Sequence, residues 1–169
     1  MNRAGRNHFK AELDALGTNS GVAQTLNGPI TTLDKLIGNP DHVLLLVRSP
    51  EGQAQGFLKY GTKDLFFYDK KGKVHNFLQC ICLLDFYVLE SCQRRGYGKQ
   101  MFEAFLDMLH QQANDKRPKS GVVQIDPCTL AYDRPSPKLL AFIAKHYNLQ
   151  HPDLQPNRYT IFEGFQLPK

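Results

Sequence analysis

The residue types and the spacing best suited to chemistry occur in the stretch Gln93-Arg94-Arg95-Gly96-Tyr97-Gly98-Lys99. This stretch follows an apolar run at 81–88 and precedes an amphipathic run that begins near Gly98. Two glycines one residue apart let backbone N–H groups approach a ligand closely, and a helix start adds donors and a positive partial charge. Since basic side chains lie on both sides, the stretch predicts an anion cradle with a pyrophosphate as its guest.

Spacing separates this cradle from two nucleotide-binding loops. A dinucleotide fold requires G-x-G-x-x-G, but Met101 occupies the third glycine position. A Walker A loop requires G-x-x-x-x-G-K-[ST], whereas Gln93 and Gln100 stand at its first glycine and its hydroxyl position. The remaining pattern, Q/R-x-x-G-x-G/A, resembles the pyrophosphate loop of the GCN5-related N-acetyltransferases (GNAT). The alternative interpretation is a basic turn that only caps a helix.

A longer series of segments carries a more specific resemblance, which runs from about Leu13 to Phe165. The segments are Ala23-Gln24, Pro29-Ile30-Thr31, Gly56-Phe57-Leu58-Lys59, Cys82-Leu83-Leu84-Asp85-Phe86-Tyr87, Glu90-Ser91, Gln93-Arg94, Asp133-Arg134-Pro135-Ser136, Lys138-Leu139-Leu140, Lys145-His146-Tyr147-Asn148-Leu149 and Ile161-Phe162-Glu163-Gly164-Phe165. In this order they resemble the catalytic domain of the α-tubulin N-acetyltransferase family. The resemblance implies acetyl-CoA as cosubstrate and α-tubulin in microtubules as acceptor, acetylated on a lysine side chain by direct attack in a ternary complex.

The same resemblance assigns the cofactor contacts. The end of the apolar run pairs with the pantetheine arm as a pseudo-strand, and these residues are Phe86, Tyr87, Val88 and Leu89. The cradle residues Gln93, Arg94, Arg95, Gly96, Tyr97, Gly98 and Lys99 take the pyrophosphate. Ser136, Lys138 and Lys145 flank the other side of the cofactor.

Two carboxylates are candidates for the general base. Asp85 lies one residue before the pantetheine segment, and Asp133 ends an expected strand just before a helix N-terminus. The resemblance implies that Asp133 is the essential one; the alternative is a carboxylate that only caps the helix. It also implies that Cys82 lines the active site and that Gln24 orients the acceptor lysine or a water. A core cysteine and a surface glutamine are the alternatives left open.

The acceptor side is suggested by a cluster of lysines. Lys59, Lys63, Lys70, Lys71 and Lys73 are balanced in this stretch only by Asp64 and Asp69. Such a run is ordinarily a solvated face. The resemblance implies instead that Lys59 and Lys63 border the active site, that Asp85 and Arg134 also face the substrate, and that this basic surface meets acidic tubulin. Two other hypotheses stay open: an acetyltransferase for another protein lysine or a small amine, and a silent module that binds acetyl-CoA or microtubules.

Composition bounds these hypotheses. With 169 residues, 41% hydrophobic and 22% charged, the chain is expected to be a single globular domain over 1–169. The sequence has no apolar run of about 18 residues, so it predicts no membrane span. The N-terminus lacks the apolar segment of a signal peptide. The four cysteines show neither C-x-x-C nor zinc-finger spacing, so we expect no metal. These features suggest a reducing intracellular compartment, and the resemblance implies the cytoplasm and microtubules, including those of cilia or flagella.

Net charge adds one expectation about partners. The formal charge of +5 favours an acidic ligand or protein. Nucleic acid is compatible with the charge alone, but no nucleic-acid-binding motif supports it. We therefore expect neither nucleic acid nor membrane as a partner.

Hydrophobic periodicity and turn residues predict the elements that must position these residues. We expect helices at 8–16, ended by Gly17, and from Pro29 to Gly38, then a strand at 42–47. Ala54–Tyr60 and Asp64–Tyr68 are expected to form a hairpin with Gly61 in its turn, followed by a basic loop at 70–73 and a long strand at 77–88.

The second half of the chain continues this alternation. We expect, in order, a helix after Gly98, a loop at 111–121, a strand within 122–132, a helix opened by Ser136-Pro137 and ending at Tyr147, and a strand at 158–162. The order predicts an α/β fold: a GNAT-like mixed, largely antiparallel central sheet flanked by helices.

Overall fold

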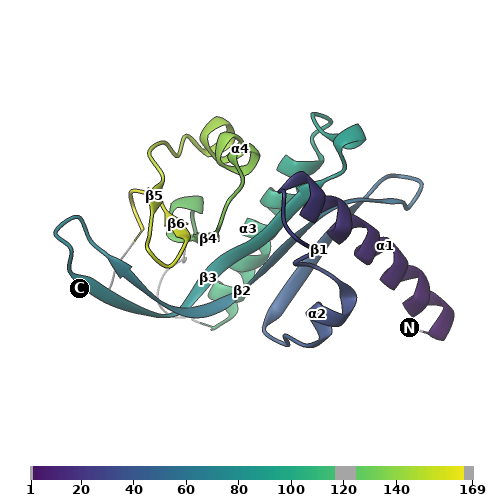
Figure 1. The fold of residues 1–169 in the computed structure, drawn as a ribbon, viewed down its shortest axis with the longest axis horizontal. Coiled ribbons are helices and arrows are strands. Elements are labelled where there is room, and N and C mark those ends of the chain that lie inside the picture. Colours follow the sequence, from purple (N-terminus) through teal and green to yellow (C-terminus); the bar gives the residue numbers. More distant parts are fainter. Residues whose placement is uncertain (1, 117–124, 166–169) are drawn as a thin grey trace. The chain divides into compact units, whose positions relative to one another are not determined.

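The computed structural model describes residues 2–116 and 125–165, in which helices and strands alternate along the chain (Figure 1). The helices are α1 (Arg3–Ala23), α2 (Leu33–Ile37), α3 (Tyr97–Lys116) and α4 (Pro137–Tyr147), with 3₁₀ turns at Glu90–Cys92 and Pro127–Thr129. The strands are β1 (His42–Arg48), β2 (Ala54–Tyr68), β3 (Val74–Val88), β4 (Ala131–Asp133), β5 (Asp153–Leu154) and β6 (Tyr159–Ile161). Within these described residues, no helix is long and apolar enough to cross a membrane.

The strands form one mixed sheet in the order β1-β2-β3-β4-β6-β5. β1 pairs with β2 antiparallel, and β6 pairs antiparallel with both β4 and β5. β3 and β4 run parallel, with Cys82 opposite Ala131 and Leu83 opposite Tyr132. The predicted mixed, largely antiparallel sheet with helices is therefore confirmed, and its parallel pair joins the strands that carry Cys82 and Asp133.

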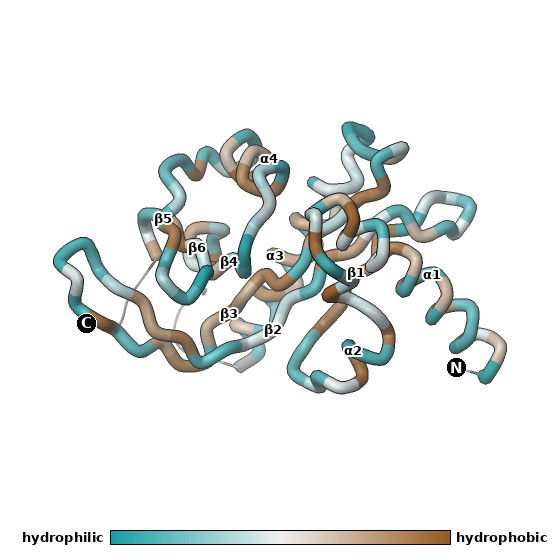
Figure 2. The backbone as a smooth tube through the Cα atoms, in the orientation of Figure 1, coloured by the Kyte–Doolittle hydropathy of each residue, from teal (hydrophilic) through white to brown (hydrophobic). Residues whose placement is uncertain are grey.

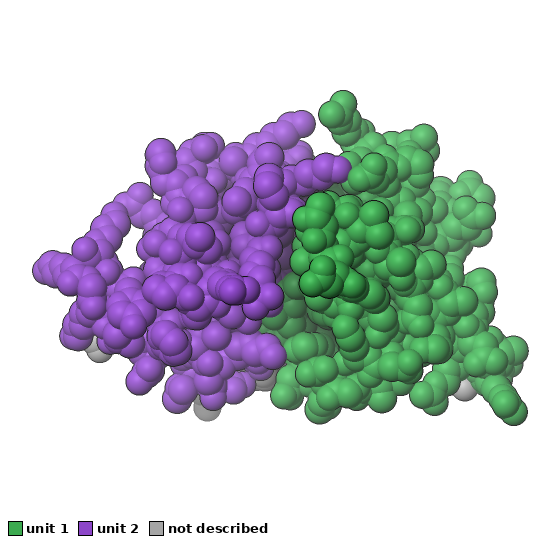
Figure 3. Space-filling model, in the orientation of Figure 1, with its two compact units in different colours: residues 1–61, 84–101 green, residues 62–83, 102–169 purple. Residues whose placement is uncertain are grey.

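The chain divides into two compact units, shown in green and purple in Figure 3. Unit 1 comprises residues 1–61 and 84–101, and unit 2 comprises residues 62–83 and 102–169. In unit 1, Leu16 of α1 packs with Phe57 and Tyr87, and hydrophilic residues alternate with the hydrophobic ones along α1 (Figure 2). The single domain expected over 1–169 stays a prediction.

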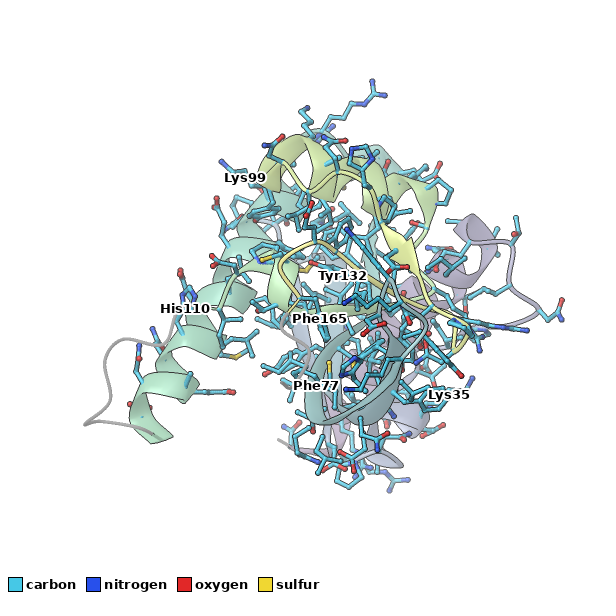
Figure 4. All side chains as sticks on the ribbon, turned by 90° about the vertical axis from the view of Figure 1, so that its left-hand side faces the viewer. Lys35, Phe77, Lys99, His110, Tyr132 and Phe165 are labelled. Carbon is cyan, nitrogen blue, oxygen red and sulfur yellow. The ribbon has the colours of Figure 1, made fainter. Side chains whose placement is uncertain are left out.

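The core of unit 2 is aromatic. Phe102 of α3 contacts three rings, with centroid distances of 5.7 Å to Phe105, 5.7 Å to Phe142 and 4.9 Å to Tyr147. Phe77 and Phe165 lie against each other with centroids 5.1 Å apart (Figure 4). The contacts of Phe102 with Phe142 and Tyr147 hold α3 and α4 together within the unit.

α1 does not end at Gly17, as the sequence predicted, but continues to Ala23. Gly17 is instead a point of close approach, because a Cβ there would lie 1.8 Å from the carbonyl oxygen of Thr31. The helix therefore reaches Ser20 and Gln24, two residues that matter for the site described below.

α2 begins later than predicted. Its first residue is Leu33 and not Pro29, because the Thr32 side chain accepts a hydrogen bond from the Lys35 N–H and caps the helix. Its predicted end at Gly38 is confirmed. The residues just before Thr32 are therefore not helical, and the Thr31 backbone packs against α1 at Gly17.

β2 is one strand of 15 residues and not a hairpin with a turn at Gly61. Gly61 pairs with His42 of β1, and a Cβ on it would lie 2.9 Å from the His42 ring. The actual turn joins β2 to β3 at the predicted basic loop, where Asp69 Oδ1 accepts from the N–H groups of Lys71 and Lys73 at 2.8 and 2.9 Å.

Around α3 and β4 the prediction is partly wrong. α3 continues to Lys116, so residues 111–116 are helical and not the start of a loop, whereas 117–124 lie outside the described residues. The strand expected within 122–132 is represented by Ala131 and Tyr132 of β4, after a 3₁₀ turn. The Ser136 cap of α4 is confirmed, while β5 was not predicted.

Candidate functional site

The predicted cradle in unit 1 has the backbone geometry of an anion-binding loop. Arg94 and Gly96 have φ of 62° and 86°, so the backbone turns sharply just before α3. The Gly96 carbonyl accepts from the Gln100 N–H at 2.9 Å and starts the helix. A Cβ on Gly96 would meet no atom within 4 Å, so the space in front of this glycine is open. Helix start, left-handed turn and open glycine together fit a phosphate group.

A residue that the sequence analysis missed anchors this loop. Gln55 of β2 is buried; its backbone carbonyl accepts from the Leu89 N–H at 2.8 Å, and its side-chain oxygen accepts from the Cys92 thiol. Gln93 reaches back along the loop, because its amide nitrogen donates to the Val88 carbonyl at 3.0 Å. A polar residue inside an apolar strand is the only sequence signal that could have identified Gln55.

The predicted pantetheine segment is the end of β3. Tyr87 and Val88 are buried, and the Tyr87 ring packs at 6.3 Å from Phe57. Burial, and then the charge of Glu90, raise the pKa of Tyr87. A ligand beside this segment would therefore meet backbone groups and not these two side chains.

Asp85, also in β3, is buried with 4% of its surface exposed. Its Oδ1 accepts from Ser20 Oγ and from Gln24 Nε2, both at 3.1 Å, and its Oδ2 accepts from Thr31 Oγ1 at 2.5 Å. The structure thus brings Gln24 and Asp85 together within unit 1. The sequence analysis did not identify Ser20 or Thr31 as their partners.

Lys59 lies in the same unit and is buried, with 6% of its surface exposed. Its ammonium group donates to the Ile30 carbonyl at 2.8 Å. The side chain therefore stabilises the segment between α1 and α2, and its expected role beside the substrate stays a prediction.

In unit 2 the parallel pair β3–β4 brings Asp133 into electrostatic range of Cys82, and Lys63 of β2 lies in electrostatic range of Cys82 as well. Cys82 is 0% exposed and its thiol donates to the Cys80 carbonyl at 3.3 Å. The Cys80 thiol, burial and the charge of Asp133 raise the pKa of Cys82, against the smaller opposing effect of Lys63. The Cys82 thiol is therefore protonated near neutral pH.

Asp133 ends β4 opposite Tyr159 of β6, with 31% of its side chain exposed. Burial raises the pKa of the Tyr159 hydroxyl, and the charge of Asp133 raises it further. Arg134 follows with its Nε 3.8 Å from Asp133 Oδ1 and with φ of 43°. A partly exposed carboxylate at a strand end can exchange protons with a bound group, which a fully buried one cannot do as readily.

A cavity of about 400 Å³ lies beside this strand end. It is lined by Arg134, Pro135, Leu140, Pro152, Leu154, Arg158 and Thr160. Next to it, the Ser136 hydroxyl accepts from the Leu139 N–H at 3.2 Å and caps α4, on which Lys138 and Lys145 are exposed. The lining of two arginines, one threonine and four apolar residues suits an acidic or amphipathic group.

The predicted site residues are thus shared between the two units. Unit 1 contains Gln24, Lys59, Asp85 and the segments 86–89 and 93–99. Unit 2 contains Lys63, Cys82, Asp133, Arg134, Ser136, Lys138 and Lys145. Among the residues that the structure describes, no three His, Cys, Asp or Glu side chains are grouped so that they could hold a metal ion.

Two solved structures resemble this fold. A mutant of the toxin AtaT, bound to the C-terminus of the antitoxin AtaR and to acetyl-CoA, has a TM-score of 0.54 at 15% identity, covering 89% of this chain and 84% of that one. A Bacillus halodurans protein has a TM-score of 0.54 at 12% identity, with 97% and 95% covered. At these identities the likeness concerns the fold alone.

The sequence match defines the class and then the family. Residues 2–169 match the model described as "GNAT acetyltransferase, Mec-17", so the class is that of the GNAT acetyltransferases. Within this class, the chain belongs to the Mec-17 family.

Curated relatives agree with this assignment. The chain is 42% identical over 154 residues to the α-tubulin N-acetyltransferase of Tetrahymena thermophila, covering 90% of this chain and 34% of that protein. It is 40% identical over 157 residues to α-tubulin N-acetyltransferase 1 of Danio rerio, covering 90% and 48%. For the Phytophthora infestans α-tubulin N-acetyltransferase the identity is 39% over 153 residues, covering 88% and 77%. The chain therefore spans less than half of the first two relatives and about three quarters of the third.

Proposed function

We propose that this protein transfers the acetyl group of acetyl-CoA to a lysine side chain of α-tubulin in microtubules. The observation that carries the proposal is the Mec-17 family match over residues 2–169. Relatives about 40% identical over 90% of the chain are named α-tubulin N-acetyltransferases, which supports the choice of acceptor.

Acetyl transfer makes three demands: the cosubstrate must be held, its carbonyl polarised and the acceptor ammonium deprotonated. Acetyl-CoA supplies the acetyl group as a reactive thioester. The cradle at 93–99 would hold the pyrophosphate, with backbone N–H groups and the helix start as donors. A backbone N–H near Tyr87 would polarise the carbonyl, and one such donor is worth about 10²–10³ in rate. Ser136, Lys138 and Lys145 would make further contacts to the cosubstrate.

Deprotonation is the most demanding step. A free lysine has a pKa near 10.4, so neutralising its amine at pH 7 costs about 4.6 kcal/mol. We assign the base to Asp133, which is partly exposed at the end of β4. Cys82 would then be a neutral hydrogen-bonding neighbour, since its raised pKa disfavours the thiolate. This arrangement supports direct attack by the lysine in a ternary complex, without an acetyl-cysteine.

We assign recognition of the acceptor to the basic residues near Asp133 and Cys82. Lys63 is half-buried in β2 and Arg134 is exposed beside the cavity, so both can contact an acidic tubulin segment. Within unit 1, the buried Lys59 would act only indirectly, by holding the segment at Ile30 through its hydrogen bond. The same substrate would place the protein on microtubules in the cell.

The test is incubation of the protein with acetyl-CoA and assembled microtubules, followed by mass-spectrometric mapping of acetyl-lysine. We expect time-dependent acetylation of α-tubulin. Activity on free amines or histones without tubulin acetylation would contradict the proposed acceptor. Acetyl-CoA binding without transfer to any amine would indicate a silent module instead.

A further inference from the structure

A buried carboxylate in unit 1 organises the C-terminal end of α1. Asp85 has three hydrogen-bond donors, and two of them, Ser20 and Gln24, lie one helical turn apart on α1. The third donor, Thr31, belongs to the segment that follows. All three donors are neutral, so the carboxylate is held by hydrogen bonds and not by an ion pair.

The chemistry of Asp85 determines which way the Gln24 amide points. A carboxylate only accepts hydrogen bonds, so the amide nitrogen of Gln24 must face it and the carbonyl oxygen must face elsewhere. The second amide hydrogen is also used, because Gln24 Nε2 donates to Ser20 Oγ at 2.8 Å. Ser20 in turn donates its own proton to Asp85, which leaves its oxygen available as the acceptor.

The other half of the amide is left as an acceptor. No described residue donates a hydrogen bond to Gln24 Oε1. The backbone of Gln24 is fixed as well, because its N–H donates to the Ser20 and Val22 carbonyls at the end of α1. Gln24 is half-buried. The result is a carbonyl oxygen of defined orientation on a rigid element, at a position with access to solvent.

We propose that Asp85 is a positioning residue, which orients Gln24 so that the Gln24 carbonyl oxygen binds the acceptor amine. This inference rests on the proposed function. A carbonyl oxygen suits the task, because it accepts hydrogen bonds and can therefore bind an N–H group of the lysine. Asp85 thus acts through Gln24 and does not contact the substrate itself.

A double-mutant cycle tests this inference. Gln24→Met keeps the length of the side chain and removes both amide groups, while Asp85→Asn allows the Gln24 amide to turn over. We expect each single variant to lower kcat/KM for microtubules about 10²-fold, the scale of a misplaced contact group, with the KM for acetyl-CoA unchanged. The double variant should be within about threefold of Gln24→Met alone, because Asp85 has no other route to the reaction.

Additive losses would overturn the proposal, and so would full activity of Asp85→Asn. If Asp85→Asn does not fold, Ser20→Ala enters the same cycle, since it removes one bond to each member of the pair. Its loss of activity should vanish in the Gln24→Met background; a loss that persists would contradict the inference.

Thr31→Val is the matched control. It removes a hydrogen bond to the same carboxylate without touching Gln24, so it should lower the melting temperature while changing kcat/KM less than about twofold. A loss as large as that of Asp85→Asn would assign the effect to stability and overturn the proposal. Wild-type protein that is inactive on microtubules would instead contradict the proposed function, so the two failures are distinguishable.

Discussion

Asp133 and Cys82 lie on neighbouring parallel strands but differ in what they can do with a proton. Asp133 is partly exposed, whereas Cys82 is buried and its pKa is raised by Cys80, by burial and by Asp133 itself. We expect Asp133→Asn to lower kcat about 10²–10⁴-fold, the range for loss of a general base, and to leave acetyl-CoA binding intact. Turnover and calorimetric titration with acetyl-CoA measure the two quantities. Unchanged turnover would exclude Asp133 as the general base.

The protonated state of Cys82 gives a separate prediction. Alkylation requires the thiolate, so iodoacetamide should modify Cys82 far more slowly than Cys128, which is half-buried and whose pKa is raised less strongly. Peptide mapping after timed alkylation of the folded protein near pH 8 measures both rates. Unfolded protein is the control, in which the two rates should be similar. Faster labelling of Cys82 in the folded state would contradict the neutral thiol.

The contact between α1 and the segment before α2 depends on a missing side chain. Gly17→Ala would place a Cβ 1.8 Å from the Thr31 carbonyl oxygen, so backbone must move. Overpacking of this kind costs about 1–3 kcal/mol, although alanine by itself favours a helix. We expect a lower free energy of unfolding in a denaturant titration. Asn19→Ala, at an exposed position of the same helix, is the control and should have little effect.

The β2–β3 turn contains a pH-dependent contact. The His75 side chain, and then the Lys73 and Lys71 N–H groups, lower the pKa of Asp69 to about 2. Because an unfolded Asp has a pKa of about 3.9, this stabilisation is present above about pH 4 and is lost as the pH falls toward 2. The Lys71 and Lys73 amide proton resonances should therefore shift in that window in an NMR titration. Asp69→Asn removes the titrating carboxylate, and a shift that persists there would refute the assignment.

Local signals in the sequence predicted some elements and not others, for a physical reason. Ser136 and Pro137 specify the start of α4 through a cap within one helical turn, so that start was predicted correctly. Gly17 and Gly61 were interpreted as a helix end and a turn, but each is small because a distant backbone segment or side chain packs on it. That information is not local and cannot be read from neighbouring residues.

The same distinction applies to the site. The cradle is a contiguous stretch, so its glycine spacing was enough to predict it. The hydrogen bonds of Asp85 to Ser20 and Thr31 join residues 65 and 54 positions apart, and no spacing pattern predicts such a pair. Cys82 and Asp133 were predicted as site residues from the family resemblance. Their electrostatic contact could not be predicted, because it depends on the parallel register of β3 and β4.

The net charge of the entire chain also affects its proposed binding to microtubules. The formal net charge is +5, and the proposed microtubule surface is acidic. Attraction between exposed charges is screened within about 8 Å at physiological ionic strength. We expect microtubule co-sedimentation to weaken as salt rises from about 50 to about 300 mM, while kcat on a free lysine peptide changes little. Salt-independent co-sedimentation would indicate an apolar interface.

Ligand binding should stabilise the whole fold if the cradle is the acetyl-CoA site. A ligand that binds only the native state at about 100 times its Kd adds about 2.7 kcal/mol to the free energy of unfolding, which a thermal melt detects as a higher Tm. Gly96→Val should abolish this shift, because φ of 86° is strained for valine and its side chain would fill the open space of the cradle. Gly72→Val is the matched control: Gly72 has φ of 78° and equally open surroundings, but lies in the β2–β3 turn. Both variants should lose intrinsic stability to a similar extent, and only Gly96→Val should lose the response to acetyl-CoA. An equal response in both variants would place the cosubstrate elsewhere.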